Sequence, residues 1–492
     1  MVNLFFEQNG GGAMEKLKEI LKRKTTWVIL LFVILFFSVN FYHTNKSLPN
    51  GVAYEGQTHM VKDVEFLYDL TYQDAHGETR MKQEIFKEIF KTIEKAEEFI
   101  VIDMFLLNGY TDDDDKYPNI SKILTKKIIE QKEKNPHLKV HIITDEINTT
   151  YNSHKVELFE TLKKHGVPIT YTDLNKLRDP NPLYSGLWRV ALQWFGQEGI
   201  GWLPNPLAEN APKVTVRSYV KLLNIKANHR KVIATEDEAI ISSANAHDAS
   251  GYHANIAFKV SGHVIGDILE SEQAVASFSG SDRLPNLEDK KSGGGEIAIQ
   301  LLTEGKIQKH IIEAISATKK GETIWLAMFY LADAEILEEL KAAAERNVKI
   351  NIILDPNQNA FGSEKIGLPN LPVAAELMNL AEENITIRWY NTGKEQFHSK
   401  LIYVEKNKES VIIGGSANFT ERNLDNYNLE TNLKIVAPNQ SEVVKEIDDY
   451  FHRLWTNEDG VFTADYEKYQ DKLPVFKYVL YLMQKLFRFT TY

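Results

Sequence analysis

Two short segments of the chain carry the same chemically active side chains at the same spacing. Each has a His, a Lys two residues later and an Asn further on: His229, Lys231 and Asn245 in the first, His398, Lys400 and Asn418 in the second. On a β-strand, residues two apart lie on one face, so each His-Lys pair can contact one substrate. Apolar runs around a charged turn predict a hairpin that returns the Asn to the His-Lys end.

These residue types suit cleavage of a phosphodiester without a metal or a cofactor. A neutral imidazole can attack phosphorus, and a second imidazole can protonate the leaving oxygen. Two ammonium groups and two amides can hold the non-bridging oxygens. Zinc is disfavoured, because Lys is no ligand at neutral pH and neither segment pairs its His with a second one at ligand spacing. The alternative, two half-buried strand histidines beside solvated lysines, is disfavoured by the matched repeat.

The repeat resembles the signature of the phospholipase D superfamily, His-x-Lys-x4-Asp followed by small residues and Asn, once per half. The resemblance covers residues 60–460. Glu236 and Glu405 stand at the Asp positions as structural acids, a change that keeps the charge. The family's Asn-x-Glu ends at Glu430 in the second half, whereas Ala257 takes the acidic position of the first half. We therefore expect two chemically unequal halves.

By this resemblance the catalytic residues are two His, two Lys, two Asn and one acid: His229, Lys231, Asn245, His398, Lys400, Asn418 and Glu430. The chain is similar to the bacterial cardiolipin synthases and phospholipases D, which pass a phosphatidyl group through phosphohistidine to an alcohol or to water. The resemblance implies that His229 is the nucleophile and that His398 protonates the leaving group. Which histidine Glu430 contacts stays open.

We call each segment with its His, Lys and Asn a cassette. Ahead of each cassette the chain repeats a predicted strand, helix and strand. Apolar runs at 99–106 and 140–145 precede the first cassette, and runs at 323–330 and 350–355 precede the second. Such runs alternating with helical patterns predict a sheet covered on both faces. We expect a duplicated phospholipase D-like α/β sandwich, whose two halves share one active site.

The expected organisation has six parts. They are a basic cytoplasmic N-terminus (1–24), a transmembrane signal-anchor (25–42), a first phospholipase D-like half (60–280), a linker (281–296), a second half (297–465) and an amphipathic C-terminal segment (466–492). Basic residues precede the apolar run 27–39, which by the positive-inside rule puts both halves outside the cytoplasm of a bacterial cell. A cleaved signal peptide is disfavoured, since no Ala-x-Ala-like site follows in 40–46.

The first half contains an insertion, because 41 more residues lie between Asp145 and His229 than between Asp355 and His398. The extra segment includes 180–212 and holds three candidate substrate-binding residues, Trp188, Trp194 and Trp202. Trp-rich loops suit an acyl-chain pocket or the membrane interface, or else a small satellite core. The C-terminal segment likewise either lies on a membrane or docks on the domain.

Composition restricts the partners. The chain has no Cys, which excludes disulfides and a thiol nucleophile. A formal net charge of −11 disfavours nucleic acid, whose binding rests on summed Lys and Arg contacts. We expect a phospholipid substrate, a membrane and an alcohol or water acceptor. The alternatives are a nuclease or other phosphodiesterase of the same family, and an inactive membrane scaffold, which the intact cassettes disfavour.

Overall fold

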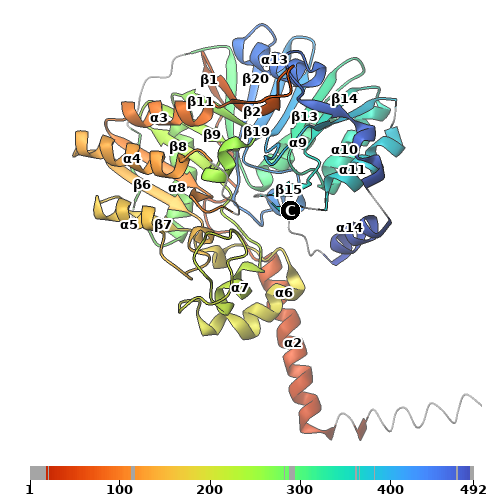
Figure 1. Ribbon diagram of the computed structural model, residues 1–492. Helices are drawn as coiled ribbons and strands as arrows, with labels where there is room; N and C mark the ends of the chain where they lie inside the picture. Colours follow the sequence, from red (N-terminus) through yellow and green to blue (C-terminus); the bar gives the residue numbers. More distant parts are fainter. Residues whose placement is uncertain are drawn as a thin grey trace, which may run out of the picture.

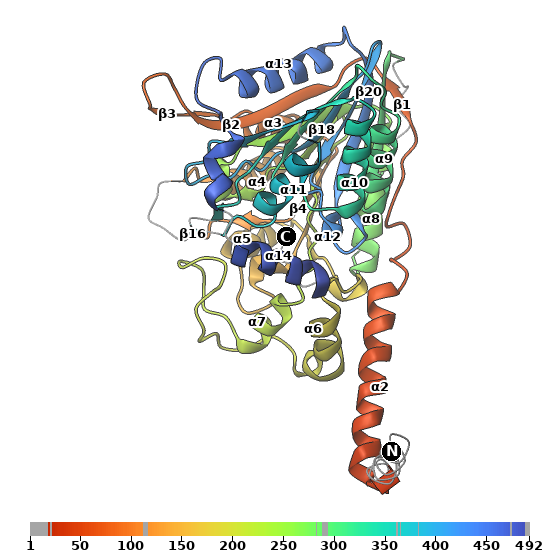
Figure 2. The same cartoon turned by 90° about the vertical axis from the view of Figure 1, so that its right-hand side faces the viewer.

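The computed structural model is built on two large mixed β-sheets (Figures 1 and 2). It describes residues 18–19, 22–111, 117–281, 283–287, 294–360, 363–364, 366–381, 383–472 and 475–487. Most of the predicted N-terminal part (1–24) and much of the predicted linker therefore lie outside the described residues.

The first sheet has the strand order β3-β2-β11-β9-β8-β4-β6-β7. In chain order its strands are β2 (Glu65–Gln73), β3 (Thr79–Lys82), β4 (Phe99–Met104), β6 (Lys139–Thr144), β7 (Ile169–Tyr171), β8 (Lys231–Thr235), β9 (Glu238–Ser242) and β11 (Asn255–Ser261). β4, β6 and β7 are parallel to one another, and the hairpin β8-β9 joins them to β11 by antiparallel pairing.

The second sheet repeats this order as β12-β20-β19-β18-β13-β14-β17, with β1 beside β12 and β21 beside β17. Its strands are β1 (His59–Val61), β12 (Ile297–Thr303), β13 (Thr323–Met328), β14 (Lys349–Leu354), β17 (Ile385–Tyr390), β18 (Lys400–Glu405), β19 (Glu409–Gly415), β20 (Thr431–Pro438) and β21 (Thr463–Asp465). The repeated order confirms the predicted duplicated α/β fold.

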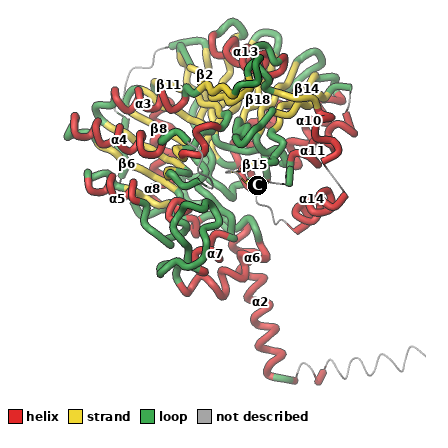
Figure 3. The backbone as a smooth tube through the Cα atoms, in the orientation of Figure 1, coloured by secondary structure: helices red, strands yellow, loops and turns green. Residues whose placement is uncertain are grey.

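Helices cover both faces of each sheet, as Figure 3 shows. One outer layer has α3 (Ile85–Lys95), α4 (Ile120–Lys134) and α5 (Glu157–Lys164), and the other has α9 (Gly305–Ser316), α10 (Ala334–Glu345) and α11 (Asn370–Ala381). Between the sheets lie α8 (Val264–Phe278) and α13 (Glu442–Thr456). Alternate residues of β8 face the two sides: Val232 packs in the central core and Ile233 in the outer one. One hydrophobic core therefore joins the two halves.

The apolar N-terminal run forms α2 (Lys24–Asn45), which projects from the body (Figures 1 and 2). By length and composition it can span a membrane, and it buries no residue. The insertion begins beside it with α6 (Pro182–Leu187), continues through single turns at Trp188–Leu192 and Gln193–Phe195, and reaches α7 (Val216–Leu222). α6 packs on α2.

The C-terminal helix α14 (Val475–Phe487) docks on the second half by one face only. Tyr481 is buried there, and Tyr478 Oη donates to Glu376 Oε1 at 3.1 Å. Phe476, Val479 and Met483 are exposed, so the helix also presents apolar side chains to the outside. The remaining short elements are β5 (Leu107–Asn108), β10 (Ala246–His247), β15 (Asn359–Ala360), β16 (Ser363–Glu364) and α12 (Glu421–Leu424).

Candidate active site

Two β-hairpins position the predicted catalytic residues. Lys231 begins β8 and Lys400 begins β18, with each His two residues earlier. β8 pairs with β9 and β18 with β19, so the predicted hairpins are confirmed. Asn245 and Asn418 follow the second strands and are buried. Their Oδ1 atoms, which are hydrogen-bond acceptors, have no partner in the described part of the chain.

The two cassettes meet where the halves touch. The His229 backbone N–H donates to Leu429 O at 2.9 Å, and that of His398 donates to Ala254 O at 2.8 Å. The backbone of each cassette is therefore hydrogen-bonded to a residue just ahead of a strand in the opposite half. Positive charge on Lys231 or His229 lowers the pKa of His398, as expected for side chains that share one site.

The two histidines have different partners. His229 Nδ1 lies 2.9 and 3.0 Å from the carboxylate oxygens of Glu430. His398 Nδ1 lies 3.1 Å from Asn255 Oδ1. Since both partners offer oxygen acceptors, each Nδ1 carries the proton and donates it, and each neutral ring keeps its lone pair on Nε2. The charged partner of His229 comes from the second half of the chain.

The structure corrects the alignment that put Ala257 opposite Glu430. Ser416 Oγ donates to Glu430 Oε2 at 2.5 Å, and the equivalent Ser243 Oγ donates to Asn255 Oδ1 at 3.1 Å. Asn255 is therefore the counterpart of Glu430. The spacing misled because 12 positions separate Asn418 from Glu430, whereas 10 separate Asn245 from Asn255. The prediction of unequal halves still holds, with an amide in place of the carboxylate.

Each Lys is held between its own backbone and an aromatic ring. Lys231 Nζ donates to His229 O at 2.6 Å, and Lys400 Nζ donates to His398 O at 2.8 Å. The rings of Phe105 and Phe329 lie 5.2 and 5.0 Å from the two ammonium nitrogens, and 4.9 and 5.0 Å from the His rings. Sequence reasoning missed these two Phe as site residues, although they follow Met at matching places in the repeat.

Burial shifts the cassettes toward their neutral forms. It lowers the pKa of His229 to about 4, although Glu430 opposes the shift, and it lowers the pKa of His398 well below its usual value. Burial also lowers the pKa of Lys231 to about 7 and that of Lys400 well below its ordinary range. At neutral pH both imidazoles are therefore unprotonated, and an anionic ligand is needed to favour two fully charged lysines.

Two buried aspartates fix the backbone ahead of the cassettes. Asp145 Oδ2 accepts from Asn228 N at 2.7 Å, and Asp355 Oδ2 accepts from Phe397 N at 2.7 Å. Burial raises the pKa of each to about 7. Both residues end strand runs that match in sequence, but only the structure gives them this positioning role.

A sequence-family model, described as "Cardiolipin synthase, PLD-like domain", matches residues 311–455, which hold the whole second cassette and Glu430. In this part the chain is similar to the phospholipase D-like domain of the cardiolipin synthases. No curated protein sequence matches the chain.

Three solved structures are similar to this chain, and the first of them supports the fold. Phosphatidylserine synthase from Haemophilus influenzae Rd KW20 has a TM-score of 0.57 and 12% identity, covering 92% of this chain and 97% of that one. Polyphosphate kinase from Porphyromonas gingivalis has a TM-score of 0.43 and 12% identity, over 82% of this chain and 49% of the other. The phospholipase D family member Nuc from Salmonella typhimurium has a TM-score of 0.27 and 20% identity, over 34% and 98%.

The two halves of the chain also differ in the buried contacts beneath the site. Arg230, between His229 and Lys231, is fully buried and contacts Glu304 at 2.7 Å and Glu272 at 3.3 Å. Glu304 Oε1 also accepts from Glu430 N at 3.1 Å. At the equivalent position the hydroxyl of Ser399 contacts that of Tyr450 at 3.1 Å, with no charged partner among the described residues. Arg230 therefore ties the first cassette to the segment that carries Glu430.

A third histidine lies beside the second cassette. His253 is buried, its ring is 5.9 Å from that of His398, and its Nδ1 accepts from Gln396 N at 3.2 Å. Its Nε2 therefore carries a proton and has no partner among the described residues. In the other half the Asn428 amide oxygen accepts from Ala227 N at 3.0 Å, so Asn428 is its counterpart.

The two acids of the cassette motif stand at the opposite ends of the strands from the lysines. Glu236 follows β8 and accepts from the backbone N–H groups of Glu97 and Phe99 at 2.5 and 3.1 Å. Glu405 is the last residue of β18 and is exposed. The contacts of Glu236 suit a structural role, whereas the structural role of Glu405 stays a prediction.

The three predicted Trp residues lie on the insertion rather than on the cassettes. Trp188 is buried, with Arg189 over its ring at 5.2 Å, whereas Trp194 and Trp202 are exposed. The insertion instead approaches the site through Leu207, Ala208 and Ala211. With Phe105 these line a cavity of about 110 Å³ beside the first cassette.

The described residues hold no cluster of three or more metal-ligating side chains. Within the two cassettes, Lys231 and Lys400 are the side chains that can bring positive charge to a phosphate.

Proposed function

We propose that this chain is a membrane-anchored phosphodiesterase and transphosphatidylase that acts on phospholipids through a phosphohistidine intermediate. The observation that carries the proposal is the contact of His229 with Glu430, which comes from the opposite half. The proposed reaction resembles those of cardiolipin synthases and phospholipases D, and the family model and the phosphatidylserine synthase fold support a lipid substrate.

In the first step His229 Nε2 attacks phosphorus. Glu430 holds the Nδ1 proton and stabilises the positive charge that the ring gains as the N–P bond forms. The P–O bond to the leaving alcohol breaks, and the alkoxide oxygen takes a proton from His398, which is protonated when the substrate anion is bound. Lys231, Lys400 and the two Asn amides bind the non-bridging oxygens.

In the second step the acceptor, an alcohol or water, gives its proton to His398. Its oxygen attacks phosphorus, the N–P bond breaks and His229 returns to its neutral form. Because His398 has an amide partner in Asn255, its charge depends on the bound phosphate more than that of His229 does. The residues assign no particular acceptor alcohol.

The apolar helix α2 is compatible with an anchor, and we propose that both halves stand outside the cytoplasm. The halves themselves are proposed to span 60–280 and 297–465.

The proposal is tested with detergent-solubilised full-length protein given phosphatidylglycerol or, separately, single-stranded DNA. We expect phosphatidylglycerol to be converted into phosphatidic acid or a transphosphatidylation product, and a His229→Ala, His398→Ala double variant to convert none. Cleavage of DNA with intact phosphatidylglycerol would favour the nuclease alternative. Turnover of neither, with a folded protein, would favour the scaffold.

A further inference from the structure

The insertion is fixed against the outer end of α2. Gly186 of α6 lies so close to Phe36 that a Cβ atom there would be 3.1 Å from its ring. Asp179 N donates to His43 O at 3.1 Å, and Lys46 Nζ donates to Asn175 O at 2.7 Å. The insertion and the helix therefore form one packed unit (Figures 1 and 2).

The position of this contact along α2 sets the height of the insertion relative to a bilayer. Phe36 stands three residues before the end of the apolar run at Val39. At a rise of about 1.5 Å per residue, the contact lies roughly 5 Å inside that end. If α2 spans a bilayer, α6 therefore stands level with the edge of the hydrocarbon region.

At this height the insertion exposes large apolar side chains. Four lie within a single segment: Trp194, Phe195, Ile200 and Trp202 are 75%, 67%, 93% and 65% exposed. Between 192 and 203 the only charged residue is Glu198. Single exposed apolar residues are ordinary on protein surfaces, but four within one short segment favour an interaction surface, and indole rings favour the membrane-water boundary.

The exposed group rests on a rigid base. Asp179, buried at the start of the insertion, contacts Arg189 at 3.0 Å and Lys226 at 2.8 Å. Trp188 is buried in this base, so it fits the alternative of a small satellite core. Trp194 and Trp202, in contrast, are exposed.

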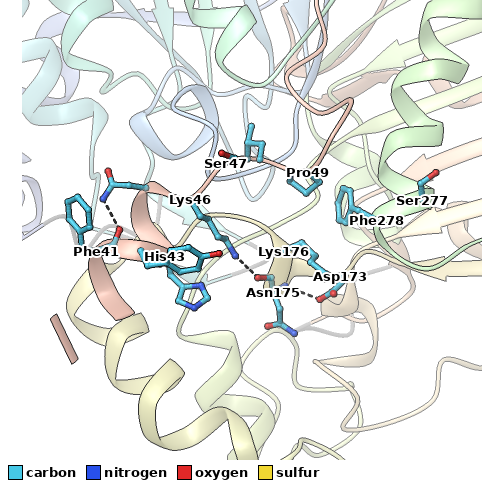
Figure 4. A pocket seen from close by; sticks show the side chains of 13 residues that line it. Phe41, His43, Lys46, Ser47, Pro49, Asp173, Asn175, Lys176, Ser277 and Phe278 are labelled. Atoms are coloured by element: carbon cyan, nitrogen blue, oxygen red, sulfur yellow. Dashed lines mark hydrogen bonds between the residues drawn. The ribbon is translucent and has the colours of Figure 1, made fainter. Parts of the chain in front are cut away.

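Beside the base, a cavity of about 1120 Å³ separates the end of α2 from the first half (Figure 4). Lys46 and Lys176 line it, together with Phe41 and Phe278. Burial lowers the pKa of Lys46 to about 7, with Lys226 and Arg189 adding to the shift. Lysine and aromatic side chains at the height of the lipid headgroups suit an anionic membrane surface, which raises the pKa of a lysine that it approaches.

We propose that residues 180–222 form a membrane-docking element whose exposed Trp194, Phe195, Ile200 and Trp202 enter the outer interface of the bilayer that anchors α2. The element holds the active site at a fixed height above the lipid, because its residues 205–211 line the cavity next to Phe105, the ring that packs on His229. The inference rests on α2 spanning a membrane, and it is independent of the phosphodiester chemistry.

The absence of Cys from the chain permits single-site labelling of the full-length protein. Trp194→Cys and Trp202→Cys variants, each carrying a polarity-sensitive fluorophore, are reconstituted into phosphatidylglycerol-phosphatidylcholine vesicles with or without nitroxide-labelled lipid. Met81→Cys is the matched control, since Met81 is an exposed apolar residue of β3, on the side of the molecule away from α2 (Figure 2). Leu31→Cys reports on α2 itself.

We expect nitroxide lipid to quench the labels at positions 31, 194 and 202 and to leave the label at 81 unchanged. Quenching at 31 with none at 194 and 202 would overturn the docking element. No quenching at 31 would overturn the membrane span and the docking with it. The measurement needs no catalytic activity, so failure of the proposed reaction would appear separately, as lost turnover with intact quenching.

Discussion

His229 and His398 occupy equivalent places in the two halves, yet among the residues that the structure describes only His229 has a charged hydrogen-bond partner. A carboxylate on Nδ1 stabilises a ring that becomes positive, whereas the amide of Asn255 orients His398 without adding charge. The difference suits two roles, a nucleophile that carries a positive phosphohistidine and an acid that is protonated only with substrate present.

Glu430→Gln tests this division of roles. The variant keeps the size of the side chain but removes the charge, so we expect turnover to fall on the order of 10²- to 10⁴-fold, the range set by neutralising a His-orienting carboxylate. The rate of phosphoenzyme formation from a p-nitrophenyl phosphodiester measures the effect. Asn255→Asp, which adds a carboxylate to the other His, is the matched control and should not reproduce the loss. Equal rates in Glu430→Gln and wild type would contradict the role of Glu430.

Ligand binding should also take up protons. In the free protein burial lowers the pKa of Lys231 to about 7, so at pH 8 this lysine is largely neutral, and burial also lowers the pKa of Lys400. A bound phosphodiester anion favours their charged forms and raises both pKa values, which draws protons from solution. Calorimetric titration of dimethyl phosphate at pH 8, in buffers with different ionisation enthalpies, measures the uptake. Identical heats in all buffers would show that the lysines are already charged.

At the residue scale the sequence indicated which His, Lys and Asn residues the two hairpins present, but it did not indicate the hydrogen-bond partners of the histidines. Glu430 is 201 residues from His229, and nothing local indicates that they touch. Asn255 was also missed as the counterpart of Glu430, because the loop before it is two residues shorter.

At the scale of elements, Arg230 holds the first cassette to the second half. Its guanidinium lies between Glu272 and Glu304, all three buried. Arg230→Met leaves these acids without their cation, and we expect a loss of about 3–5 kcal/mol in unfolding free energy. Ser399→Ala, at the equivalent position, loses one hydroxyl contact and should cost about 1 kcal/mol. Chemical denaturation in detergent compares them, and similar midpoints for both variants would contradict the bridging role.

The strands and helices could be predicted because their apolar runs are long and repeat in the same order. The pairing of β1 with β12 could not, since it joins residues about 240 positions apart, and neither could the packing of Gly186 on Phe36. The insertion was located by its length alone. Its position along α2 depends on tertiary packing, so the sequence could not indicate it.

At the scale of the whole molecule, a central hydrophobic core joins the two halves, and the apolar helix α2 projects from them. If the basic flank of α2 stays in the cytoplasm, protease added to intact protoplasts should digest both halves and spare a short N-terminal fragment. Immunoblots with tags at either end distinguish the products. Full protection of the C-terminal tag in intact protoplasts, with digestion after lysis, would place the active site in the cytoplasm.

The central claim is that both halves serve one site in which His229 forms the covalent bond to phosphorus. A p-nitrophenyl phosphodiester tests it most directly, because its leaving group needs little help from an acid. We expect His398→Ala to accumulate a phosphoenzyme, mapped by mass spectrometry to His229, and His229→Ala to form none. A phosphoryl group on His398 in the His229→Ala variant would exchange the two roles, and the absence of any covalent adduct in the wild type and both variants would contradict the mechanism.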